Sequence, residues 1–358
     1  CQPSGDFSKL GIGCDDAYLA QQAGQQSALS PRCFVNPHTG YYPTGCTTHP
    51  SGTNAGLLEV NVADLVITAG GAGAPVRYFC QHQYITADDA LAHNQDNNAS
   101  SREMATNFVT NNWVFKFATG SSTYMGIPAI RQWKSIDPGV VETDIDTPED
   151  DGFPGLVIMA AKATDLGNGF WHYEYAVNNL NSDRSIASFS VPCSPYVTVQ
   201  NIGFHDVEYR GGDGMGGLNF DGTDWPGTNA DGAITWATMP YAVSDNANAL
   251  RWGTLYNFRF DANTPPASGL VTLGEYKVVT SVTATTVIPS GVTCLKGDVN
   301  GDGLVDGADV AAFSQLLVAG GGTAAQNCAA DVVSPPAGVI SEGDIDPFVN
   351  CVLSGGCP

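Results

Sequence analysis

The chain has 358 residues, of which 43% are hydrophobic, so it can bury the core of one large domain or two moderate ones rather than remain disordered. Its 14 Lys and Arg residues are outnumbered by 36 Asp and Glu residues, which gives a formal net charge of -22 at pH 7. So acidic a chain repels nucleic-acid phosphates and anionic lipid headgroups, and it favours divalent cations as partners. There is no run of about 18 apolar residues, so no membrane span is expected.

Ten cysteines, an even number, favour disulfide bonds and therefore an oxidising, extracellular location. The chain begins at Cys1 rather than Met, which we interpret as the trace of a removed signal peptide. In an alternative interpretation, Cys1 is the acylated first residue of a lipoprotein. The many possible pairings leave the connectivity open, but proximity favours Cys33 with Cys46, and Cys328 with Cys351.

Residues 1–55 are rich in Gly, Ser, Pro and Gln and show little alternation of polar and apolar residues. A short helix is predicted over 21–30, where the sequence reads QQAGQQSALS. We expect the rest of 1–55 to be an extended arm that is tied by disulfides. Such an arm could lie on a neighbouring subunit and add a strand or fill a groove there.

Residues 56–292 are predicted to form an antiparallel β-sandwich of the jelly-roll or Ig-like type. The clearest strand is FWHYEYAVNNL at 170–180, in which apolar and polar residues alternate in the way that a half-buried strand requires. Long amphipathic helices are missing between the strands, which argues against a parallel α/β sheet. Strand-like segments, separated by Gly, Asn, Asp and Pro, lie at 57–70, 76–86, 111–119, 155–164, 170–180, 185–193, 197–209, 249–262 and 279–289.

The composition changes again at 293–358, where two acidic segments are each followed by apolar residues at helical spacing. The first segment reads GDVNGDGLVDGAD at 297–309. A calcium ion takes six to eight oxygen ligands, and a twelve-residue loop supplies them from positions 1, 3, 5, 7, 9 and 12, with Gly at position 6. Counted from position 1, the predicted ligands are Asp298, Asn300, Asp302, the carbonyl of Leu304, Asp306 and Asp309, and Gly303 occupies position 6.

This loop ends in Asp rather than Glu and precedes a helix, so residues 295–357 resemble a dockerin-type duplicated repeat. The resemblance implies a small helical calcium-binding domain, and some members of that family dock onto cohesin modules. The second repeat departs from the pattern, because its loop is two residues longer and keeps only Asp331 and Asp344 at its ends. We therefore expect one calcium ion at the first loop. Whether the second loop binds an ion stays open.

Other segments resemble secreted, uncharacterised proteins of planctomycete-like bacteria that end in dockerin-like repeats. These segments include DFSKLGIGCDDAY, WHYEYAVNNLNSDRSIASFSVP and NALRWGTLYNFRFDA. The resemblance spans most of the chain and implies secretion, but it carries no activity.

Sequence signals of catalysis are weak. The chain has no CxxCH, HExxH, GxSxG or GxxxxGK[ST] motif, which removes covalent c-type haem and the common zinc-protease, serine-hydrolase and P-loop readings. Cys80 and His82 could supply two metal ligands, but no second cluster lies at useful spacing. Neighbouring His205 and Asp206 in a strand point to opposite faces, so a structural role is expected for both.

Two carboxylate clusters leave three interpretations open. The carboxylates at 144–151 and 221–231 could form a glycosidase pair, could bind a further calcium ion, or could simply belong to solvated turns. We favour the turns. Trp225 could stack on a sugar ring, although packing in the core or a turn is favoured.

These observations predict a non-enzymatic, secreted structural protein that self-assembles into an extracellular filament or surface layer, stabilised by calcium and disulfides. Its expected partners are other copies of the chain, and a cell-surface glycan or scaffold protein is also possible. A polysaccharide-binding module that attaches through its dockerin-like tail is the first alternative. A secreted hydrolase is the second.

Overall fold

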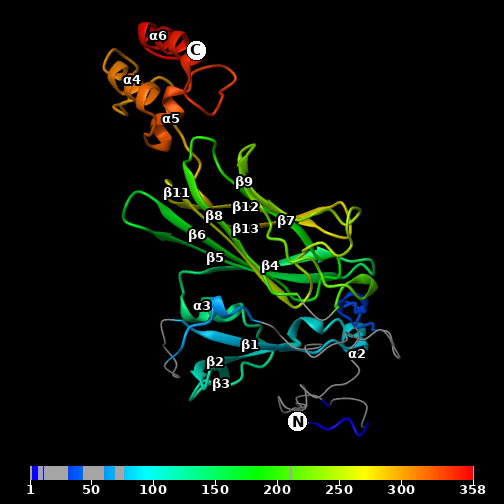
Figure 1. Cartoon of the computed structure of the whole chain (residues 1–358). Helices are drawn as coiled ribbons and strands as arrows, with labels where there is room; N and C mark the ends of the chain where they lie inside the picture. The colour runs from blue at the N-terminus through cyan, green and yellow to red at the C-terminus, as the bar shows by residue number, and fades with distance from the viewer. Residues whose placement is uncertain are drawn as a thin grey trace.

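The computed structural model describes residues 2–6, 11, 31–42, 60–68, 76–209 and 212–357. In these residues the fold is mainly β, with three antiparallel sheets and a small group of helices at the C-terminal end (Figure 1). The helix predicted over 21–30 and most of the predicted arm lie outside the described residues. Within 31–42 the chain forms a 3-10 turn at Arg32–Phe34.

A three-stranded sheet comes first along the chain, in the order β1-β2-β3. Its strands are β1 (Tyr78–Gln83), β2 (Ala99–Val109) and β3 (Asn112–Phe117), and the short helix α2 (Ala87–Leu91) lies between β1 and β2. Thr110 and Asn111 join β2 to β3 with φ of 51° and 62°, the left-handed conformation that two-residue hairpin turns require. The helix α3 (Arg131–Ile136) then leads to the larger sheets.

Two five-stranded sheets form the body of the molecule. One has the order β4-β5-β6-β11-β8 and the other the order β13-β12-β7-β10-β9. Their strands are β4 (Val141–Pro148), β5 (Pro154–Asp165), β6 (Trp171–Asn179), β7 (Ile186–Pro192), β8 (Val199–His205), β9 (Gly227–Ala230), β10 (Ala233–Ala237), β11 (Thr254–Ala262), β12 (Pro266–Glu275) and β13 (Ser281–Pro289).

The main core lies between these two sheets and takes side chains from both. Tyr175 of one sheet packs edge-on against Phe189 of the other, with ring centroids 5.3 Å apart. The Tyr175 hydroxyl also donates a 2.8 Å hydrogen bond to the carbonyl of Val287 on β13, so its polar end is satisfied inside the core. The same alternation that predicts a strand at 170–180 therefore places Tyr173, Tyr175 and Val177 in one core.

Strand β5 is buried on both of its faces, which explains its nearly continuous apolar run. Val157 and Met159 enter the main core, whereas Ile158 and Ala160 enter a second cluster with Ile130, which lies just before α3. A strand that is covered on both sides no longer needs polar residues at alternate positions.

The C-terminal residues form three helices: α4 (Asp309–Ala319), α5 (Ala324–Ala330) and α6 (Ile345–Ser354). They lie at one end of the five-stranded sheets, at the opposite end from the three-stranded sheet (Figure 1). Their own small core contains Val299, Phe313, Leu316, Ala329, Ala330 and Phe348. None of the described helices has the length and apolar character needed to cross a membrane.

The prediction of a mainly β chain is confirmed, but individual strands differ. Of the segment 57–70, predicted as a strand, the described part at 60–68 forms a 3-10 turn at Val62–Asp64, because the Asn61 side chain accepts the backbone N–H of Ala63. Strands β2, β4, β9, β10 and β12 were not predicted. Polar or acidic residues dominate β2 and β4, and β12 contains Pro266 and Gly269, so neither pattern favours a strand.

Candidate metal centre

The loop at 298–309 is built around the carboxylate of Asp298. Its Oδ1 accepts the backbone N–H groups of Gly301 and Asp302 at 2.9 and 3.1 Å, and its Oδ2 accepts that of Gly303 at 2.9 Å. Gly303 has φ of 89°, a conformation that a residue with a Cβ adopts only under strain, so this turn requires glycine. The sequence expectation for position 6 therefore agrees with the local backbone.

Asp309 closes the loop from the first residue of α4. Its side chain is fully buried, and its two oxygens accept the N–H groups of Asn300 and Asp306 at 2.9 and 3.0 Å. One carboxylate thus joins the beginning of the loop to its end. It also places a negative charge at the N-terminus of α4, where the helix dipole is favourable to it.

The remaining predicted ligands lie along the same loop. Asp302 accepts the N–H of Leu304 at 2.9 Å, and Asp306 accepts that of Ala308 at 2.7 Å. The Leu304 side chain is a hydrocarbon, so only its backbone carbonyl can serve as a ligand. Asn300 donates to Asp302 through its side-chain amide at 3.1 Å.

Carboxylate, amide and carbonyl oxygens are the kind of donor that a hard cation takes. Among the described residues, no Lys, Arg or His forms an ion pair with Asp298, Asp302, Asp306 or Asp309. A buried carboxylate without a cationic partner is costly, and an oxygen-ligated ion would compensate it. In the part of the chain that the structure describes, no group of three or more His, Cys, Asp and Glu side chains lies close enough together to hold a metal ion, so calcium here stays a prediction.

The second loop repeats part of this arrangement. Asp344 accepts the N–H groups of Val333 and Ser341 at 3.0 and 2.9 Å. In the first loop, Asp309 accepts the N–H groups of the equivalent residues, Asn300 and Asp306. Asp331 accepts the N–H of Gly338 at 2.7 Å, and both aspartates are fully buried. The inserted residues therefore leave the backbone path around the two carboxylates largely unchanged.

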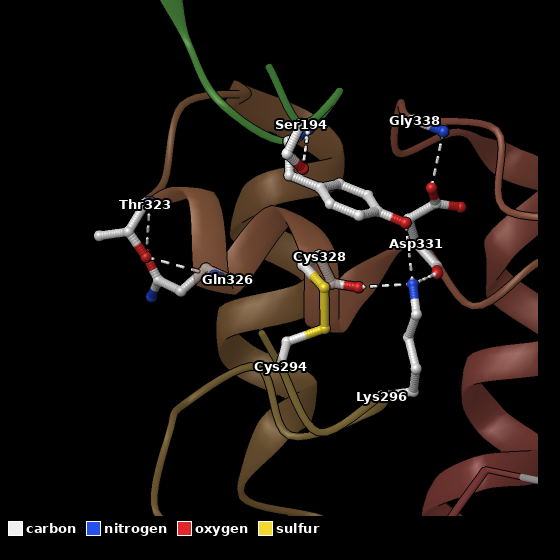
Figure 2. Close-up of a disulfide and its surroundings, with 9 residues drawn as sticks. Ser194, Cys294, Lys296, Thr323, Gln326, Cys328, Asp331 and Gly338 are labelled. Atoms are coloured by element: carbon white, nitrogen blue, oxygen red, sulfur yellow. Dashed lines mark hydrogen bonds between the residues drawn. A yellow bond between two sulfur atoms is a disulfide. The ribbon is translucent and has the colours of Figure 1, made fainter. Parts of the chain in front are cut away.

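The ammonium group of Lys296 lies beside the second loop, and the sequence analysis did not predict this contact. The Lys296 ammonium donates to the carbonyl oxygens of Asp331 and Cys328 (Figure 2). It also donates to the Tyr196 hydroxyl at 3.0 Å. Burial lowers the pKa of Lys296, and the charges of Asp331 and Asp344 act against that fall. Lys296 is the sole Lys or Arg in residues 293–358. A single basic residue in so acidic a segment was the sequence signal that could have indicated its role.

Tyr196 connects the β sheets to Lys296 and the second loop. It lies in the turn between β7 and β8, and its ring centroid is 4.9 Å from the Lys296 ammonium. Burial, followed by the proximity of Asp331, raises the pKa of the Tyr196 hydroxyl to about 12, so the hydroxyl stays protonated at neutral pH. The second loop, its lysine and the sheets therefore form one connected site.

The predicted pairing of Cys328 with Cys351 is wrong. Cys294 bonds to Cys328, and Cys351 bonds to Cys357. Figure 2 shows the first bridge, which ties the segment that follows β13 to α5. Proximity along the chain misled the prediction, because the packing of α5 against residues 294–297 decides which sulfur atoms meet. Cys46 lies outside the described residues, so its predicted pairing with Cys33 stays a prediction.

The other candidate pairs occupy structural positions. Cys80 and His82 share one face of β1, where Cys80 is an exposed free thiol and His82 stacks on Tyr84. His205 lies 3.4 Å from Asp64, whereas Asp206 accepts a hydrogen bond from Asn248, so the two neighbours have different partners. That divergence agrees with the expected structural roles.

The carboxylates at 144–151 are held by separate cations and loops. Asp144 pairs with Arg131 at 2.9 Å, and Asp150 pairs with Arg184 at 3.0 Å. Glu149 accepts the Ser182 hydroxyl at 2.8 Å, and burial raises its pKa. These contacts favour structural roles over a paired acid and base.

The cluster at 221–231 is a set of turns around a buried tryptophan. Asp221 accepts the N–H of Thr223, and Asp231 lies in the β9–β10 hairpin turn with φ of 53°. Trp225 is 1% exposed, donates its indole N–H to Asn248 and stacks on Phe204. Core packing is confirmed for Trp225, so this ring presents no face to a sugar.

One shallow hollow lies where β4 meets β12 and β13. It has a volume of about 270 Å³ and is lined by Val141, Pro266, Ala267, Ser268, Thr285, Thr286 and Val287, none of which is titratable. Comparison of the whole chain with protein-family models gave no match, and comparison with curated proteins gave none either.

Proposed function

We propose that the protein is a secreted structural protein whose copies assemble outside the cell into a filament or surface layer. In this proposal the two five-stranded sheets form a β-sandwich, and residues 293–358 form a dockerin-like module that one calcium ion stabilises through the loop at 298–309. The extracellular location is supported by two disulfides in the described residues.

One observation carries the structural role: the helical module is fixed to the sheets. Four residues separate the end of β13 at Pro289 from the bridged Cys294, and Lys296 holds Tyr196 of the β7–β8 turn. A tail that serves only to attach a free binding module to a scaffold needs a flexible linker. A fixed module instead transmits force between its two ends, as a subunit of an assembly must.

Calcium has a defined task in this proposal. Without the ion, four carboxylates of the first loop lie within one twelve-residue turn and repel one another. Their repulsion would loosen the start of α4 and, through the bridge between Cys294 and Cys328, the attachment of the module. Assembly is therefore expected to depend on calcium.

The test is electron microscopy of the full chain with calcium and after chelation. We expect ordered filaments or sheets with calcium, and frayed or dispersed material after chelation. The variant Asp302→Asn should behave with calcium as the wild type does after chelation, because it removes one charged ligand. Asp346→Asn, which neutralises an exposed carboxylate on α6, serves as the matched control. Dispersed monomers in every sample would refute the proposal.

A further inference from the structure

The three-stranded sheet has two unlike faces. Its inner face contacts the body of the molecule: Gln81 accepts the N–H of Ala129 at 2.8 Å, the Ser101 hydroxyl donates to Ile127, and Gln83 donates to Leu180. The opposite face is called here the outer face. It consists of Tyr78, Cys80 and His82 on β1; Ser100, Arg102, Met104, Thr106 and Phe108 on β2; and Trp113, Phe115 and Phe117 on β3.

The outer face is apolar, and its β2–β3 half is open, whereas residues 66–68 cover it at Thr106. Six of its eleven side chains are Met, Phe, Tyr or Trp. Phe108, Phe115 and Phe117 are 46%, 45% and 48% exposed, which is far more than aromatic rings keep inside a fold. Because the strands pair in register, these rings form one continuous strip, and contiguous apolar strips of this kind mark interaction surfaces.

The outer face also differs in charge from the rest of the chain. It carries no Asp or Glu, although the whole chain has a net charge of -22. Its guanidinium, that of Arg102, lies 4.2 Å from the Phe117 ring centroid and donates to the Ser121 carbonyl. Two copies can therefore approach each other through this face without bringing carboxylates together.

We propose that the outer face is a self-association surface, which packs against the outer face of a second copy of this chain. This inference rests on the proposed function and names one surface of the assembly. A two-fold contact alone gives a dimer, so a filament or layer needs a second contact elsewhere on the chain. Two such faces stack as sheets do in a sandwich, with their aromatic strips in contact. The contact is isologous, since each copy contributes the same residues and a two-fold axis relates them.

The polar groups of the outer face favour a second copy over a glycan. A sugar site needs polar groups that are free to orient the ligand. Here the Thr106 hydroxyl is buried and donates to the Val66 carbonyl, and Arg102 is held by Ser121. What the face offers is apolar area, which another apolar face matches.

The test measures association of the full chain by sedimentation velocity over a concentration series with calcium. Phe115→Glu and Phe108→Glu each place a carboxylate within the apolar strip, where the contact would have to bury it without a cationic partner. We expect each to weaken association by about 30-fold or more, the effect of losing one strong interface contact. Val279→Glu changes an exposed apolar residue outside this face and should associate as the wild type does.

Cys80 supplies an independent readout on the same face. Its free, exposed thiol should react more slowly with iodoacetamide as the wild type associates, whereas the buried Cys193 should stay unreactive at all concentrations. Protection of Cys193 in Phe115→Glu and Phe108→Glu also shows that the variants are folded. Peptide mass spectrometry distinguishes the two sites.

Two outcomes would overturn the inference, and they differ from failure of the proposed function. Filaments that persist unchanged in Phe115→Glu and Phe108→Glu would place the assembly surface elsewhere and leave the proposed function intact. A wild type that is monomeric, yet binds an insoluble neutral polysaccharide and loses this binding in Phe115→Glu, would assign the face to a glycan and overturn both proposals.

Discussion

Phe313 of α4 and Phe348 of α6 stack face to face, with ring centroids 3.9 Å apart and ring planes 3° apart. Phe313 follows Asp309 by four residues, and Phe348 follows Asp344 by the same interval, so the rings are equivalent positions of two loop-helix repeats. Both are buried. Either repeat alone would expose its ring, so the stack is the contact that makes the two repeats one unit.

Replacement of either ring should therefore destabilise the whole module. We expect Phe313→Ala and Phe348→Ala each to cost about 3–5 kcal/mol, the usual effect of removing a buried phenyl ring. Because the rings contact each other, the double variant should cost less than the sum of the two. Hydrogen exchange of the α4 and α6 amides measures this locally.

Val318→Ala is the control for this prediction, since Val318 lies on the same helix and is 87% exposed. It should change the free energy of unfolding by no more than about 0.5 kcal/mol. Additive costs in the double variant would show that the rings do not support each other.

Calcium should act on one repeat and spare the other. On chelation we expect the amides of Gly301 and Gly303 to exchange faster, because the Asp298 carboxylate that holds them is no longer shielded from its neighbours. The amide of Gly338 should keep its protection, since the Lys296 ammonium remains beside the second loop. Hydrogen exchange followed by mass spectrometry resolves the two loops.

The size of the calcium effect follows from mass action. At a free concentration one hundred times the Kd, the ion should add about 2.7 kcal/mol to the stability of the module. Asp302→Asn should reduce this gain and Asp346→Asn should not. Equal exchange of Gly301 with and without chelator would show that the first loop binds no ion.

The two disulfides found in the described residues should contribute unequally. The bridge between Cys294 and Cys328 spans 34 residues, whereas the bridge between Cys351 and Cys357 spans 6. The chain-entropy model assigns them about 4 and about 2 kcal/mol. Paired Cys→Ser variants, compared by urea unfolding, should follow this order; the reverse order would show that native contacts outweigh chain entropy.

The sequence was most informative where burial has a regular period. The alternation at 170–180 and the apolar run at 155–164 both lie in β strands of the main core. β4 was missed because three of its residues are Glu142, Asp144 and Asp146. Arg131, which donates to the first two of these carboxylates, comes from outside the sheet. Sequence periodicity does not report such long-range ion pairs.

The same limit applies to the C-terminal site. The spacing of the first loop predicted the glycine turn at Gly303, because that geometry is local. The contact between Lys296 and Tyr196 joins residues 100 positions apart, and the pairing of Cys294 with Cys328 depends on how α5 packs. Neither follows from local spacing, so both required the fold.

His172 on β6 should make the stability of the protein depend on pH. His172 Nδ1 lies 2.7 Å from Asp261, and His172 Nε2 lies 3.0 Å from Glu174. Burial lowers the pKa of His172, but its contacts with the two carboxylates outweigh burial and leave the pKa above its ordinary value of 6.5.

The sign of the effect follows from the raised pKa. The folded state holds the proton more tightly than the unfolded state, so the contribution is fully present below about pH 6.5 and is lost as pH rises through the folded pKa. The wild type should therefore have its largest stability advantage over His172→Gln at pH 6. This advantage in unfolding free energy should be smaller at pH 8. Urea unfolding at both values tests this prediction, and His82→Gln, which alters an exposed histidine on β1, is the control. A difference between wild type and His172→Gln that stays constant with pH would mean that the folded and unfolded proteins bind this proton equally, so that the fold does not raise the pKa of His172.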